Sequence, residues 1–143
     1  MKPKLLIVDD DQLLREVIGD FLSSHGYEVD LAENADNALE KFEPGKYQLA
    51  LIDYMMPGMN GLELMKSLMQ QDPKIFCLIM TGYPTVDSAF QSVVDGASDY
   101  IVKPFQLKEL FPNQFSNENP LPNTLSKWLN TAVAETKRLN KQL

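Results

Sequence analysis

Five polar residues could do chemistry in this sequence, and each ends or follows a short apolar run: Asp9, Asp10, Asp53, Thr81 and Lys103. Three carboxylates without a histidine or thiol partner suit a hard cation such as Mg²⁺ or Mn²⁺. A cation, a hydroxyl and an ammonium group around a carboxylate suit phosphoryl transfer, with Asp53 as the nucleophile. The residue types therefore predict an aspartate that accepts a phosphoryl group.

The elements that must position these residues are five short runs: "KLLIV" (4–8), "YEVDLA" (27–32), "QLALID" (48–53), "IFCLIM" (75–80) and "SDYIV" (98–102). They read as strands, and the stretches between them have helical periodicity. Strand–helix alternation predicts a mainly parallel sheet covered by helices on both faces. Because parallel strands end at one edge of a sheet, the five polar residues should converge there.

The expected helices have recognisable starts and stops. The first carries an apolar stripe over 13–22 and stops at Gly26, and the second begins after Asn34 and closes at Pro44. The third follows a tight turn at Gly58 and Gly61, and a fourth spans about 85–95. A loop is expected at 112–124 and a last helix at about 125–142, which either packs on the sheet or forms a linker.

Four segments in register, "LLIVDDD", "LALIDYMMPGMNGLEL", "LIMTGY" and "GASDYIVKPF", make the sequence resemble the receiver domain of two-component response regulators. The resemblance covers residues 4–105. It implies an α/β, flavodoxin-like fold, which is a doubly wound five-stranded parallel sheet in the order 2-1-3-4-5. The enlarged loop before the last helix departs from the family pattern.

The resemblance also implies roles for individual residues. Asp53 would be the phosphoacceptor, and Asp9 and Asp10 would hold Mg²⁺ together with Asp53 and the backbone carbonyl of Met55. Mn²⁺ could substitute for Mg²⁺, and Asp10 is the preferred direct ligand of the first pair. Asp11 would instead serve the start of the first helix, where a negative charge is favourable.

Two further roles follow from the same resemblance. Thr81 and Lys103 would contact the phosphoryl group. Tyr100 would rotate when Thr81 moves toward that group, which makes a two-state switch.

His25, at a helix end, reads as a surface residue and not as a phosphohistidine, so the phosphoryl group must come from a partner histidine kinase or histidine phosphotransfer protein.

Composition sets the outer bounds. The chain has 143 residues and a formal net charge of −7, with no basic stripe, which disfavours binding to nucleic acid or to an anionic membrane surface. Cys77 lies in an apolar run and reads as a small core hydrophobe. No apolar run is long enough for a signal peptide or a membrane span. We expect a single domain, residues 1–143, in the cytoplasm.

The main functional hypothesis is a signalling switch that catalyses its own phosphorylation and dephosphorylation and is not otherwise an enzyme. One alternative is a receiver-like interaction module that is never phosphorylated. Another is an aspartyl-phosphate phosphatase, although the two residues after Asp53 offer no second acid. The output function, the oligomeric state, with a homodimer as one option, and the role of the loop at 112–124 stay open.

Overall fold

The computed structural model describes residues 3–81, 96–102, 131 and 134. Residues 131 and 134 are helical, and both fall within the expected last helix. The other positions of that helix, the fourth helix at 85–95, Lys103 and the loop at 112–124 lie outside the described residues.

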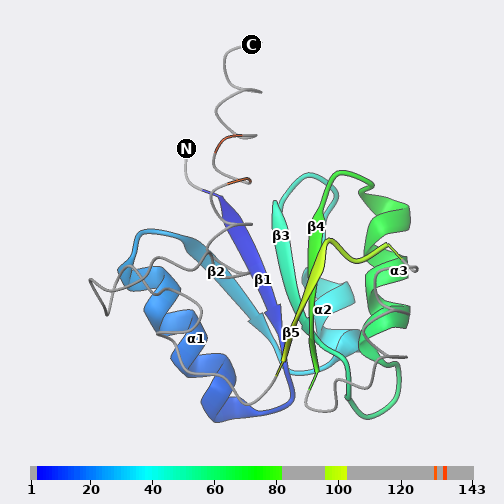
Figure 1. Cartoon of the computed structure of the whole chain (residues 1–143), viewed down its shortest axis with the longest axis horizontal. Coiled ribbons are helices and arrows are strands. Elements are labelled where there is room, and N and C mark those ends of the chain that lie inside the picture. Colours follow the sequence, from blue (N-terminus) through cyan, green and yellow to red (C-terminus); the bar gives the residue numbers. More distant parts are fainter. Residues whose placement is uncertain (1–2, 82–95, 103–130, 132–133, 135–143) are drawn as a thin grey trace.

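Five parallel strands form one sheet: β1 (Lys4–Val8), β2 (Glu28–Ala32), β3 (Leu49–Asp53), β4 (Phe76–Thr81) and β5 (Asp99–Val102). Their order is β2-β1-β3-β4-β5, which confirms the predicted doubly wound topology. The strands run in the same direction, so their carboxyl ends meet at the lower edge of the sheet in Figure 1.

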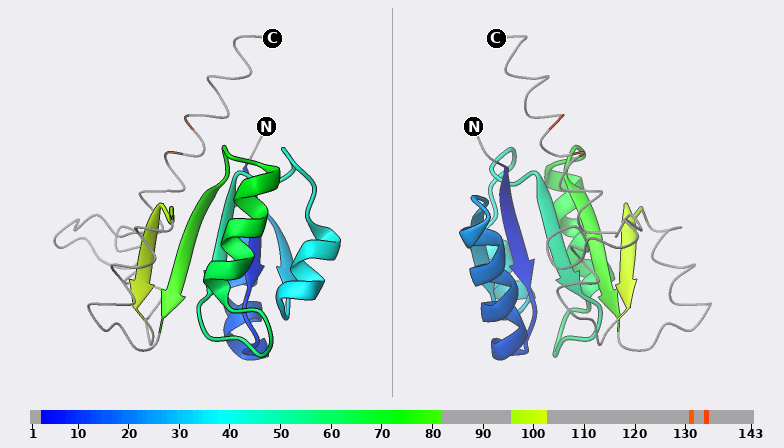
Figure 2. Two further views of the ribbon diagram at one scale, coloured as in Figure 1. Left: turned by 90° about the vertical axis from the view of Figure 1, so that its right-hand side faces the viewer. Right: turned by 60° about the vertical axis from the view of Figure 1, so that its left-hand side comes forward.

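Three helices are described: α1 (Gln12–Ser24), α2 (Ala35–Lys41) and α3 (Gly61–Gln71). Figure 2 shows α1 on one face of the sheet and α2 and α3 on the other. The second helix ends at Lys41, one turn before the expected stop at Pro44, because Phe42 turns to an extended conformation with φ −74° and ψ 135°. No helix among the described residues is long and apolar enough to cross a membrane.

The side chains of the central strands alternate between two apolar clusters, one on each face of the sheet. Leu5 and Ile7 of β1 belong to the cluster under α1, whereas Leu6 and Val8 belong to the cluster under α2 and α3. Because successive side chains of a strand point to opposite faces and both faces are buried here, every position of the strand must be apolar. This explains the unbroken apolar runs in the sequence. Cys77 is buried within the sheet, and burial raises the pKa of its thiol to about 12, as does the nearby charge of Asp72.

A polar side chain caps the start of each described helix. Asp11 accepts a hydrogen bond from the backbone N–H of Leu14 at 3.2 Å, so it is the N-cap of α1. Asn34 and Asn60 cap α2 and α3 in the same way. The predictions that Asp11 serves a helix start and that Asn34 is an N-cap are therefore confirmed.

Candidate functional site

Buried polar side chains mark one edge of the sheet. Four polar side chains are buried among the described residues, and three of them, Asp9, Asp53 and Thr81, lie at or directly after the carboxyl ends of β1, β3 and β4. The fourth, Asp72, lies at the opposite edge, where it accepts hydrogen bonds from the backbone N–H groups of Gly45 and Lys74. Burying a carboxylate costs free energy unless its charge is compensated. The carboxyl edge of the sheet, which holds Asp9 and Asp53, therefore requires a compensating cation or hydrogen-bond donors.

Three carboxylates converge at this edge. One oxygen from each of Asp9, Asp10 and Asp53 lies within 4.8 Å of the others. Asp9 and Asp53 are 0% and 5% exposed, whereas Asp10 is exposed to solvent. Three hard oxygen donors with an open side fit Mg²⁺, which retains several waters and binds through only a few carboxylates. The convergence expected from the strand ends is therefore present.

The loop after β1 holds Asp9 through its backbone and its side chain. The N–H of Asp9 bonds to the carbonyl of Ala32 at 3.2 Å, and its Oδ1 accepts from the N–H of Asp11 at 2.8 Å. The carbonyl oxygen of Asp9 accepts from Nη1 of Arg15 at 2.6 Å. The sequence analysis did not find Arg15, because one basic residue on a helix gives no signal of its target.

The backbone next to Asp53 is held by hydrogen bonds to β4 and to the start of α3. The next residue, Tyr54, donates its N–H to the carbonyl of Met80 at 2.8 Å and accepts from the N–H of Gly61 at 3.0 Å. A Cβ on Gly61 would lie only 2.3 Å from the carbonyl oxygen of Asp53. The start of α3 thus rests directly on the backbone of Asp53.

Of the two glycines expected in the turn before α3, only Gly58 has a backbone angle that favours glycine. Gly58 has φ +80°, which favours glycine, so the turn prediction holds at this position. Gly61 is instead the first residue of α3 and is needed for close packing on Asp53. The prediction of a turn role for Gly61 is therefore wrong, because sequence spacing cannot distinguish a turn from a close backbone approach.

The other predicted site residues differ in how far the structure describes them. Thr81 ends β4 and is buried. Tyr100 pairs with Ile79, two residues before Thr81, so side-chain alternation puts Thr81 and Tyr100 on the same face of the sheet. Met55 lies in the loop after β3 and is 59% exposed, and Lys103 is outside the described residues.

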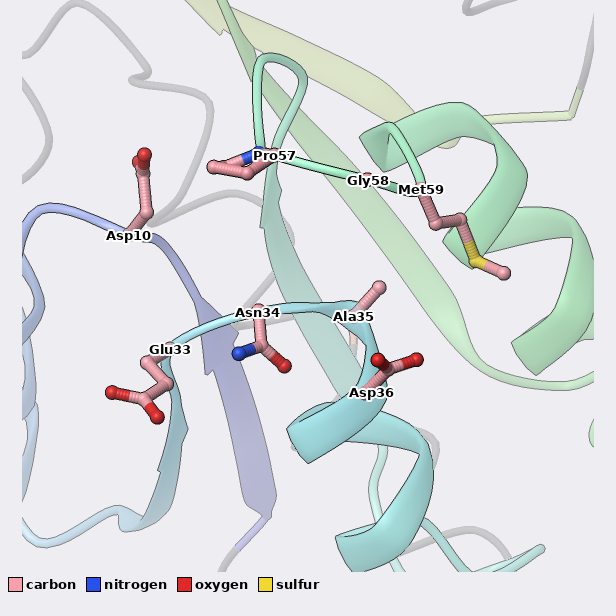
Figure 3. Close-up of a pocket in the computed structure, with 8 residues that line it drawn as sticks. All are labelled: Asp10, Glu33, Asn34, Ala35, Asp36, Pro57, Gly58 and Met59. Carbon is pink, nitrogen blue, oxygen red and sulfur yellow. The ribbon is translucent and has the colours of Figure 1, made fainter.

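A pocket of about 320 Å³ lies beside the carboxylates. Asp10 and the loop before α3 form one side of it, and the start of α2 forms the other (Figure 3). Its lining residues are Asp10, Glu33, Asn34, Ala35, Asp36, Pro57, Gly58 and Met59. Asp53 and Thr81 are not among them, so the pocket adjoins the carboxylate cluster through Asp10 alone and has a negatively charged wall.

The family model of the response regulator receiver domain matches residues 5–113, which include the described sheet except for Lys4, the first residue of β1. The chain belongs to this family. Similar relatives of the receiver domain are the response regulator protein FleR of Pseudomonas aeruginosa, 37% identical over 77% of the chain, and the two-component response regulator PhoP of the same species, 38% identical over 75%. The transcriptional regulatory protein CrdR of Helicobacter pylori is 37% identical over 85% of the chain.

Solved structures agree with the fold. A CheY-like response regulator receiver domain protein from Methanospirillum hungatei matches with a TM-score of 0.78 and 29% identity, over 94% of this chain and 99% of that one. The non-phosphorylated HemR receiver domain from Leptospira biflexa matches with a TM-score of 0.74 and 27% identity, over 79% of this chain and 91% of that one. By contrast, the chain covers only 23% of FleR, 48% of PhoP and 58% of CrdR.

Proposed function

We propose that the receiver domain is a phosphorylation-dependent signalling switch in which Asp53 accepts a phosphoryl group from a histidine kinase or a histidine phosphotransfer protein. The observation that carries this proposal is the convergence of Asp9, Asp10 and Asp53 at the carboxyl edge of the sheet. Asp9 and Asp10 can bind a cation together with one carboxylate oxygen of Asp53, while the other oxygen of Asp53 stays available to react. Membership of the receiver family supports the same assignment.

The transfer step needs little from the protein beyond position and charge. A carboxylate oxygen of Asp53 attacks the phosphorus of the donor, forming an O–P bond while the N–P bond of the phosphohistidine breaks. The electron pair of that bond stays on the imidazole nitrogen. Mg²⁺, held by Asp9, Asp10, Asp53 and the carbonyl of Met55, would supply positive charge for the phosphoryl oxygens. Water attack on phosphorus later returns Asp53 and inorganic phosphate.

Thr81 and Tyr100 are the proposed switch. The hydroxyl of Thr81 would donate a hydrogen bond to the phosphoryl group, with Lys103 binding another phosphoryl oxygen. Movement of Thr81 toward the site would open space for Tyr100, which lies on the same face of the sheet. Phosphorylation would then favour the conformation with Tyr100 turned inward, which is a shift between two populations.

The proposal is tested by intact-mass measurement after incubation with Mg²⁺ and a small acyl phosphate donor such as acetyl phosphate. The wild-type chain should gain the mass of one phosphoryl group, and Asp53→Asn should gain none. Asp72→Asn is the matched control, because it neutralises the buried carboxylate at the opposite edge of the sheet, and it should be labelled like wild type.

Two results of the labelling experiment would contradict the proposal. Equal labelling of Asp53→Asn would place the acceptor elsewhere, and an unlabelled wild type would favour an interaction module that works without phosphorylation. A turnover assay with generic phosphate esters covers the enzymatic alternative. Rapid multiple turnover of such esters would indicate a phosphatase.

A further inference from the structure

Arg15 makes a contact that no role proposed above explains. Its Nη1 donates a hydrogen bond of 2.6 Å to the backbone carbonyl of Asp9. Arg15 is in the first turn of α1, where its own N–H bonds to the carbonyl of the N-cap Asp11 at 3.0 Å. Side chains on a helix point back toward its N-terminus, so a long side chain at this position reaches the loop that precedes the helix.

The carbonyl that Arg15 holds belongs to the peptide bond between Asp9 and Asp10. Because a peptide unit is planar, fixing its oxygen also fixes the direction in which the chain leaves Asp9 and enters Asp10. Two further contacts of this loop hold the N–H and the carboxylate of Asp9. Asp10 is exposed, so its carboxylate depends on the orientation of this peptide for its place in the cluster.

Charge alone gives no reason for the contact. Among the described residues Arg15 forms no salt bridge with a carboxylate, and its guanidinium bonds to a neutral carbonyl. A positive charge near a cation site repels the cation, so on Coulombic grounds Arg15 would weaken Mg²⁺ binding. A geometric role and an electrostatic role therefore predict opposite effects of removing the guanidinium.

We propose that Arg15 is a positioning residue that orients the Asp9–Asp10 peptide so that both carboxylates reach one cation. This inference rests on the proposed function of the carboxylate cluster as a Mg²⁺ site. Arg15 does not touch the phosphoryl group or the cation in this role. It acts only through the backbone between the two carboxylates.

The first test is calorimetric titration of the unphosphorylated chain with MgCl₂. Because loss of a group that orients metal ligands typically weakens metal binding by about 10–100-fold, Arg15→Met should weaken Mg²⁺ binding by about tenfold. Arg15→Lys keeps a long donor and should recover most of the affinity. Lys74→Met is the charge-matched control, because Lys74 is exposed and precedes β4 at the opposite edge of the sheet; it should bind like wild type.

Three outcomes would overturn the inference. Unchanged or tighter Mg²⁺ binding by Arg15→Met would show that the guanidinium acts through its charge or not at all. If Arg15→Lys binds Mg²⁺ no more tightly than Arg15→Met, the hydrogen bond is not the cause of the effect. If the wild-type chain does not bind Mg²⁺, the carboxylate cluster is not a Mg²⁺ site and Arg15 cannot act through it. Thermal unfolding without Mg²⁺ establishes that each variant is folded.

A second measurement separates this inference from the proposed function. The rate of labelling by the acyl phosphate donor is followed against Mg²⁺ concentration. Arg15→Met should need about ten times more Mg²⁺ for its half-maximal rate and should approach the wild-type rate at saturation. If wild type is never labelled although it binds Mg²⁺, the phosphorylation proposal fails alone. If wild type and Arg15→Met have the same Mg²⁺ dependence, the role of Arg15 fails alone.

Discussion

Three consecutive aspartates have three different environments in this receiver domain. Asp9 is fully buried, Asp10 is exposed at the site, and Asp11 caps α1. Asp9 also accepts a hydrogen bond from the N–H of Asp11, which couples the cluster to the start of the helix. Identical side chains acquire different roles because the chain turns from strand to helix within these three residues.

Gly61 allows a testable prediction about the position of Asp53. Gly61→Ala puts a Cβ 2.3 Å from the carbonyl oxygen of Asp53 and 2.9 Å from Cα of Tyr54, so either α3 or the strand end must move. Because these are backbone atoms, we expect a loss of about 1–3 kcal/mol in the free energy of unfolding. The labelling rate of Asp53 should fall as well. Urea unfolding and the intact-mass assay measure the two effects.

Gly19→Ala is the control for Gly61→Ala. A Cβ at Gly19 would meet a flexible atom, Cδ2 of Leu31, at 3.1 Å. The higher helix propensity of alanine, worth about 1 kcal/mol, should offset that contact. An equal loss of stability in both variants would contradict a specific role for Gly61.

At the scale of the elements, a polar cluster joins β1, β2 and the segment before β3. The hydroxyl of Tyr47 donates a hydrogen bond of 2.5 Å to Oδ2 of Asp30. Nζ of Lys4 and Nζ of Lys46 lie 3.4 and 3.8 Å from the same oxygen. Partial burial raises the pKa of Asp30, but the hydrogen bond from Tyr47 and the two ammonium groups outweigh it and hold that pKa below its ordinary value.

The shifted pKa values give this cluster a predicted pH dependence. A lowered folded-state pKa stabilises the fold above the unfolded-state pKa of Asp30, 3.8, and this stability is lost as the pH falls through the lower folded value. For Tyr47 the pKa is raised, by burial and by the hydrogen bond to Asp30. Its contribution is therefore complete below pH 10.0 and is lost as the pH rises further.

Tyr47→Phe tests this cluster. Because Asp30 is partly exposed, we expect a modest loss, about 1 kcal/mol in the free energy of unfolding at pH 7. The difference from wild type should shrink below about pH 4 and above about pH 10, as urea titrations across pH would measure. Tyr27→Phe is the control. Burial also raises the pKa of Tyr27, but no described carboxylate accepts a hydrogen bond from its hydroxyl, so the stability difference between Tyr27→Phe and wild type should not change at acid pH. A pH-independent loss for Tyr47→Phe would refute the coupling.

At the scale of the whole molecule, the fold brings carboxylates together in a chain whose formal net charge is already −7. Without a cation, Asp10 repels Asp9 and Asp53. Asp10→Asn should therefore raise the free energy of unfolding in the absence of Mg²⁺ by on the order of 1 kcal/mol.

The same substitution should remove the stabilisation that Mg²⁺ provides. For wild type this gain is about 2.7 kcal/mol at a Mg²⁺ concentration of 100 times Kd. Thermal unfolding with and without Mg²⁺ measures both effects. Asp20→Asn removes an exposed charge from α1 outside the cluster and should show neither. If Asp10→Asn is stabilised by Mg²⁺ as much as wild type is, Asp10 is not a ligand.

Local pattern was sufficient to predict the strands and two of the helix starts, because strand period, helix period and cap residues are properties of neighbouring positions in the chain, whereas the strand order came from the family resemblance. The apolar runs predicted all five strands to within one residue at either end, and Asp11 and Asn34 were identified as helix starts. Parallel order then placed Asp9, Asp10 and Asp53 at one edge. The family resemblance, from four segments in register, agrees with the family model.

Only the tertiary structure decided which side chains and backbone atoms meet across these elements. The contact of Arg15 with the Asp9 carbonyl depends on the angle at which α1 leaves the loop. The contact of Gly61 with Asp53 joins residues that are 8 positions apart in the sequence, and the hydrogen bond of Tyr47 with Asp30 joins residues that are 17 positions apart. Such contacts follow from how helices pack on the sheet, and no local period of the sequence encodes that packing.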